Sequence, residues 1–132
     1  MDPEDVRRRM KEARIHLNFC MTVYRDQFQR GKHFLHEHPI SASSWKEESV
    51  ELIASHPQVD TVVGDMCQYG MKIQEQPGII KPVKKSTRWM SSSNAMLERL
   101  KARCPGDHEH ASLLDGRAKE AAIYPNVFAL KS

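Results

Sequence analysis

The sequence lacks the features that mark membrane and secreted proteins. No apolar run approaches the roughly 18 residues that a membrane span requires, and the start of the chain, M-D-P-E-D, is acidic and lacks the apolar segment of a secretory signal. Only three cysteines occur, Cys20, Cys67 and Cys104, and their wide spacing is typical of reduced thiols rather than of a disulfide framework. We therefore expect an intracellular protein, cytoplasmic or nuclear, that folds as one domain over residues 1–132.

Signatures of several enzyme classes are also missing. The chain has no nucleophile elbow, no P-loop and no GxGxxG motif, so hydrolase, nucleoside-triphosphatase and dinucleotide-binding functions lack support. Its formal charge of +3 is small, so any binding of nucleic acid must come from local basic clusters.

The clearest predicted element is one amphipathic helix from about Pro3 to about Arg30. Asp2 can cap it, Pro3 suits its first turn, and Gly31 is a stop. Its apolar positions recur at spacings of four and three: Val6, Met10, Ala13, Leu17, Cys20 with Met21, Tyr24 and Phe28. The arginine-rich opposite face is either a solvated surface or a phosphate-binding face. The heptad-like spacing also allows a coiled-coil dimer.

The next segments predict a strand, a helix and a second strand, the content of a parallel βαβ unit. The strand covers residues 32–37, Ser44 and Glu47 form a capping box for a helix over residues 45–55, and residues 59–63 form the second strand. Beyond them we expect a hairpin of residues 71–73 and 79–80, a strand at 87–90 and a helix at 94–103. A helical turn over residues 116–122 and an apolar segment after Pro125 complete the prediction.

Two clusters of polar residues are candidates for binding. Cys104, His108 and His110 follow a C-x3-H-x-H pattern, and thiolates and imidazoles are zinc ligands. The spacing is not a standard zinc-finger pattern, so no metal site is assigned and these three residues stay candidates. The alternative is a polar loop.

The best candidates for phosphate contact are Lys81, Lys84, Lys85 and Arg88, which are followed by Trp89. A solvated hairpin rim is the alternative.

Several motifs resemble the glutamate motif and later motifs of cytosine-5 DNA methyltransferases. Residues 34–39 read F-L-H-E-H-P and resemble the F-x-x-E-N-P variant of the glutamate motif. Residues 65–70 and 84–89 resemble the D-x-C-x-Y-G … K-P-T-R segment of phage-like members. Residues 104–110 and 121–125 are similar to their closing C-x-G-x-H-x-H … A-x-Y-P. Related segments occur in retroelement-type polyproteins, which the chain resembles over nearly its whole length.

The resemblance implies roles for particular residues. Glu37 would hold the target base at the catalytic site beside His38, and Thr87 and Arg88 would support the active-site loop or contact the strand. His38 stands where the family has asparagine, and Ser86 where it has proline. The glycine-rich loop for S-adenosylmethionine and the Pro-Pro-Cys nucleophile segment are absent, so the resemblance covers only the C-terminal half of a catalytic domain.

From these observations we expect an α/β domain with a partial Rossmann-like methyltransferase fold: a long helix, a few mostly parallel strands, a hairpin and C-terminal helices. The expected function is that of a methyltransferase-like fragment, inactive alone, that binds no cofactor by itself. S-adenosylmethionine would be needed by a complete domain, and the partners would be DNA or another nucleic acid and a missing N-terminal half. One alternative is a nucleic-acid-binding module without catalysis, which salt-dependent binding of DNA would identify. The other is a structural or dimeric helical remnant, which a sedimentation measurement of the oligomeric state would test.

Overall fold

The N-terminal helix, α1 (Pro3–Gln29), begins and ends where the sequence predicts. Asp2 accepts a hydrogen bond from the backbone N–H of Glu4 at 3.0 Å, and Pro3 occupies the first turn. Gly31 follows the helix with a φ of 76°, in the left-handed region that favours glycine. The computed structural model describes residues 2–111, so the predicted helical turn at 116–122 and the segment after Pro125 lie outside the described residues.

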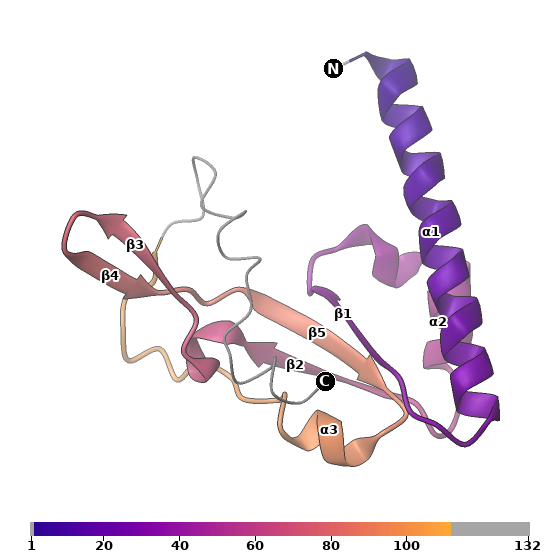
Figure 1. Ribbon diagram of the computed structural model, residues 1–132. Coiled ribbons are helices and arrows are strands. Elements are labelled where there is room, and N and C mark those ends of the chain that lie inside the picture. Colours follow the sequence, from indigo (N-terminus) through magenta and orange to yellow (C-terminus); the bar gives the residue numbers. More distant parts are fainter. Residues whose placement is uncertain (1, 112–132) are drawn as a thin grey trace.

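After α1, short elements alternate along the chain (Figure 1). They are β1 (Leu35–Pro39), the 3₁₀ helix η1 (Ser43–Lys46), α2 (Glu48–Ala54), β2 (Asp60–Asp65), the 3₁₀ helix η2 (Met66–Tyr69), β3 (Lys72–Gln76), β4 (Ile79–Pro82), β5 (Ser86–Ser91) and α3 (Asn94–Glu98). The hairpin of β3 and β4 is confirmed, and Ser93 caps α3 by accepting from the N–H of Met96 at 3.3 Å. The capping box predicted at Ser44 and Glu47 is wrong, because the Glu47 side chain pairs with Arg14 instead of capping α2.

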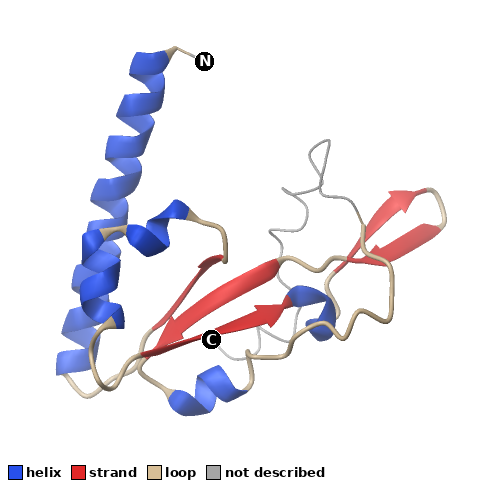
Figure 2. Ribbon diagram, turned by 180° about the vertical axis from the view of Figure 1, so that it is seen from behind, coloured by secondary structure: helices blue, strands red, loops and turns tan. Residues whose placement is uncertain are grey.

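The predicted parallel βαβ pair and Rossmann-like fold are wrong. The main sheet has the order β1-β5-β2, and β5 pairs antiparallel with both neighbours, so no described strands pair in parallel (Figure 2). The residues Thr87, Trp89, Met90 and Ser91 are all at most 4% exposed. β5 is therefore buried on both faces, which is the requirement for a central strand, and it separates β1 from β2.

Two hydrophobic cores lie on the two faces of this sheet. The helix-side core joins α1 and α2 to the sheet and consists of Leu17, Met21, Phe34, Val50, Ile53, Val59 and Met90. The second core, here called the hairpin-side core because β3 contributes to it, consists of Met66, Met71, Ile73, Val83, Trp89, Leu97, Leu100 and Ala111. Adjacent residues of a strand point to opposite faces, so Trp89 and Met90 on β5 enter different cores.

Two elements extend beyond the sheet at opposite ends of the molecule (Figure 1). They are the N-terminal half of α1 and the hairpin of β3 and β4. Among the described residues, no helix combines the length and the apolar composition needed to cross a bilayer.

Candidate metal centre

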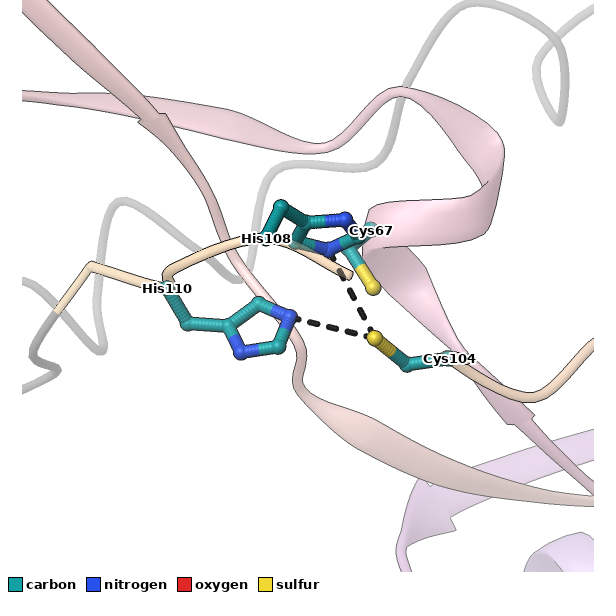
Figure 3. Close-up of side chains that lie close together, drawn as sticks. All are labelled: Cys67, Cys104, His108 and His110. Atoms are coloured by element: carbon teal, nitrogen blue, oxygen red, sulfur yellow. Dashed lines mark hydrogen bonds between the residues drawn. The ribbon is translucent and has the colours of Figure 1, made fainter. Parts of the chain in front are cut away.

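Four potential metal ligands converge at one end of the sheet (Figure 3). Cys67 lies in η2, directly after β2, whereas Cys104, His108 and His110 lie in the irregular segment that follows α3. Their ligand atoms all lie within 4.8 Å of one another, and each residue is partly buried. Folding thus adds Cys67 to the three candidates of the C-x3-H-x-H pattern.

Two distances within the cluster match those between ligands of one tetrahedral zinc ion. The Sγ atom of Cys104 lies 3.5 Å from Nε2 of His108 and 3.5 Å from Nε2 of His110. A tetrahedral zinc ion, with Zn–S near 2.3 Å and Zn–N near 2.0–2.1 Å, places a sulfur and a nitrogen ligand about 3.5 Å apart. Two thiolates and two imidazoles also complete the coordination of zinc without an open position, which is the pattern of a structural rather than a catalytic site.

Hydrogen bonds outside the cluster orient its ligands. Nδ1 of His108 lies 2.7 Å from Oδ1 of Asp107, so a proton on Nδ1 leaves the Nε2 lone pair directed toward the cluster. The side-chain amide of Gln68 donates to the sulfur of Cys67 at 3.5 Å. The backbone N–H of Gly106 donates to the sulfur of Cys104 at 3.4 Å. Both sulfurs therefore have N–H donors of the kind that stabilise thiolate ligands.

Asp65 fixes the segment that carries Cys104. Its carboxylate is 1% exposed and accepts hydrogen bonds from the backbone N–H of Cys104 at 2.6 Å, from the hydroxyl of Ser86 at 2.5 Å and from Nε of Arg103 at 3.1 Å. Burial alone would raise the pKa of Asp65, but these hydrogen bonds and the charge of Arg103 together lower it. The carboxylate therefore stays ionised and holds Cys104 beside η2.

A close backbone approach supports the same arrangement. The N–H of Asp65 donates to the carbonyl of Ala102 at 2.8 Å, so the segment after α3 runs alongside the end of β2. A Cβ atom at Gly64 would lie 2.1 Å from the carbonyl oxygen of Leu100. Only glycine at this position lets the two backbones come this close.

Burial raises the pKa of the Cys67 thiol. The neighbouring Cys104 and the charge of Asp65 also raise it, while the hydrogen bond from Gln68 acts in the opposite direction. A bound divalent cation reverses this balance, because it stabilises the thiolate directly. The three cysteines of the chain are free thiols, in agreement with the prediction from their spacing.

The residues that the resemblance assigns to a catalytic site lie on β1, apart from the four potential metal ligands. Glu37 and His38 are adjacent in a strand and so point to opposite faces of the sheet. His38 lies on the helix side with His36, their ring centroids 4.8 Å apart. His36 is 6% exposed, and its Nδ1 shares a 3.0 Å hydrogen bond with the hydroxyl of Tyr24. Burial, with a smaller contribution from His38, lowers the pKa of His36 to about 4.

The five predicted nucleic-acid contacts do not form one continuous surface. Thr87 is fully buried, and the guanidinium of Arg88 stacks over the Trp45 ring at 5.3 Å on the helix side of the sheet. Lys81 pairs with Glu75 at 3.2 Å and with Glu109 at 3.6 Å. Lys84 and Lys85 lie in the loop before β5, where Lys84 is exposed and its carbonyl accepts from the N–H of Met66 at 2.6 Å. This loop is thereby attached to the segment that carries Cys67.

Cys67 is not among the candidate ligands that the sequence pattern indicates, and only folding brings it to the cluster. Cys67 and Cys104 are too far apart in the sequence to form a recognisable motif of spaced metal ligands. The useful signals were indirect, namely a thiol in a turn-rich segment and an incomplete set of three ligands elsewhere.

Comparison of the chain with protein-family models, with curated protein sequences and with solved structures gives no significant match. The candidate function therefore rests on the arrangement of the residues.

Proposed function

We propose that the chain is a zinc-binding module in which Cys67, Cys104, His108 and His110 hold one structural zinc ion. The observation that carries the proposal is the convergence of these four ligand atoms within 4.8 Å from two distant segments. A zinc ion there would cross-link η2 to the irregular segment after α3, and metal binding would contribute to folding.

The test is the metal content of the purified, reduced chain. We expect one zinc ion per chain by elemental analysis, and cobalt substitution should give the absorption of tetrahedral cobalt with thiolate charge transfer. Cys67→Ser and Cys104→Ser should each lose tight binding. Cys20→Ser is the matched control, because Cys20 is a free thiol on α1, away from the cluster, and this variant should keep one zinc ion. Full zinc content in Cys104→Ser, or none in the unmodified chain, would contradict the proposal.

A second proposed function is nucleic-acid binding through the loop that contains Lys84 and Lys85. The exposure of Lys84 and the hydrogen bond between its carbonyl and Met66 support it, because a metal-fixed segment would then hold a basic loop in place. Binding of duplex DNA should weaken steeply with salt and decrease when both lysines are changed to glutamine. Changing Lys32 and Lys46, two exposed lysines elsewhere, is the matched control. Absence of binding at low salt would remove this function.

The methyltransferase-like role stays a prediction that rests on the sequence motifs around Glu37. Since the cofactor loop and the nucleophile segment are absent from the sequence, the purified chain with S-adenosylmethionine and DNA should transfer no methyl group. Measurable transfer would show that the chain is active without a further half.

A further inference from the structure

The N-terminal half of α1 carries an apolar face that no other described residue covers. The 27-residue helix is about 40 Å long, and its C-terminal half packs through Leu17 and Met21 into the helix-side core. The N-terminal half extends past α2 and the sheet (Figure 1). There Val6 is 38% exposed and Met10 is 57% exposed.

This face continues an interface that exists within the chain. Val6, Met10 and Ala13 repeat the spacing of four and three residues that leads on to Leu17. They therefore form the same stripe along the helix, of which the second half already packs against α2 and the sheet. A stripe that is half occupied by one helix has the shape to receive another helix along its remaining length.

The residues beside the exposed stripe are basic. In heptad terms, with Val6 and Ala13 at d and Met10 at a, the flanking e and g positions hold Arg7, Arg14 and Arg9. At the C-terminal end of this stretch the complementary charge comes from Glu47, the residue before α2, which binds Arg14 through two hydrogen bonds of 3.1 Å.

These flanks disfavour pairing with a second copy of the chain. Parallel pairing would bring g positions against e positions, and antiparallel pairing would bring like positions together, so arginine would face arginine in both cases. A partner helix with acidic flanks instead gives attraction on both sides of the stripe.

Nucleic acid fits this half of α1 less well. Arg7, Arg8 and Arg9 are consecutive and so point in directions about 100° apart, which gives no single row of positive charge. Arg8 also pairs with Asp5 at 3.3 Å and Arg7 loosely with Glu4 at 3.9 Å. The apolar stripe is the continuous feature of this half, and the arginines are its flanks.

We propose that the N-terminal half of α1 is a docking surface for an acidic amphipathic helix of a partner protein. The partner helix places its apolar residues on Val6, Met10 and Ala13 and its acidic residues beside Arg7 and Arg9. This surface lies apart from the candidate metal centre, so its test uses the full chain as purified and does not depend on zinc binding.

The probe is a synthetic helical peptide with leucine at a and d and glutamate at e and g. A peptide with lysine at e and g is its control. We expect the glutamate peptide to bind with a salt-sensitive affinity and the lysine peptide to bind at least about tenfold more weakly. Met10→Asp should abolish binding, whereas Ile15→Asp should not. Ile15 is 59% exposed, almost the same as Met10, but lies on the other side of the helix. Circular dichroism checks that both variants keep the helix.

A charge reversal gives the sharper result. Combining Arg7→Glu and Arg9→Glu should invert the preference, so that the lysine peptide binds more tightly than the glutamate peptide. The proposal is overturned if the peptides bind equally, if Ile15→Asp is as harmful as Met10→Asp, or if the chain self-associates through this stripe. It is also overturned if duplex DNA displaces the peptide, or if the peptide binds only after removal of residues 112–132.

Discussion

The two cores of this protein are built from different kinds of structure. The helix-side core lies between two α-helices and the sheet, and regular backbone hydrogen bonding supports most of the segments that line it. Segments of the hairpin-side core include a two-stranded hairpin, a 3₁₀ helix, a five-residue helix and an irregular segment that contributes Ala111. Short elements of this kind contribute little stability by themselves. We therefore expect burial to be sufficient on the helix side, whereas the other side would also need the proposed zinc cross-link.

Removal of the metal should have the largest effect and should act on one core. Zinc binding supplies about 10 kcal/mol in small domains that fold around it. After chelation we therefore expect amides of residues 66–71 and 101–111 to exchange rapidly, while those of residues 17–29 and α2 stay protected, as measured by hydrogen–deuterium exchange. The Cys20→Ser variant with zinc bound should match the unmodified chain. Equal loss of protection on both faces would show that the cores are not separable.

The opposite perturbation is Met90→Ala in the helix-side core. Met90 is fully buried, and truncation of a buried methionine costs about 2–5 kcal/mol. Urea unfolding should show this loss with zinc and also after chelation, and zinc stoichiometry should not change. If Met90→Ala weakens zinc binding as strongly as a ligand substitution does, the two faces are coupled through β5.

Gly64→Ala tests the close backbone contact between Gly64 and Leu100, next to the four potential metal ligands. The new Cβ would overlap the Leu100 carbonyl, and a backbone atom cannot rotate away as a side chain can. We expect a loss of about 3 kcal/mol in the free energy of unfolding. Zinc affinity should fall as well, because the displaced segment carries Cys104. Gly70→Ala is the comparison for a glycine with open space, where only backbone strain at a φ of 85° is added. Unchanged zinc affinity in Gly64→Ala would contradict the positioning role of this contact.

The pH dependence of the helix-side core should depend on His36. Its folded pKa, about 4, lies below the ordinary value of 6.5, so the unfolded chain binds a proton between these pH values and the folded chain does not. Stability should therefore fall as the pH drops from about 6.5 to about 4 and then level off, by roughly 2 to 3 kcal/mol.

The measurement compares urea unfolding of the unmodified chain and His36→Leu at pH 7 and at pH 4. Release of zinc by acid is common to both proteins, so it cancels in the difference between them. The stability of the unmodified chain relative to His36→Leu should decrease at pH 4. A constant difference would show that His36 is not the titrating group.

Local patterns predicted the helices and turns better than the sheet. Asp2, the apolar spacing along α1 and Gly31 act within a few residues of one another, and they located the longest helix correctly. The hairpin also followed from the turn at Gly78. The predicted parallel pair was wrong because the order strand, helix, strand in the sequence does not exclude a later strand, here β5, from lying between the two strands in the sheet. A strand that is buried on both faces, as β5 is, also lacks the alternation of apolar and polar residues by which a strand is recognised in a sequence.

The sequence by itself determined the long helix with its apolar stripe, the hairpin, and the C-x3-H-x-H pattern that contains three of the four candidate ligands. Only the tertiary structure decided the antiparallel strand order, the position of His38 on the helix side of the sheet, and the fourth candidate ligand. The physical reason is the range of the interactions involved. Capping, turn conformation and helical periodicity depend on neighbours within one or two turns, whereas Cys67 meets Cys104 only because Gly64 and Asp65 hold two distant segments together.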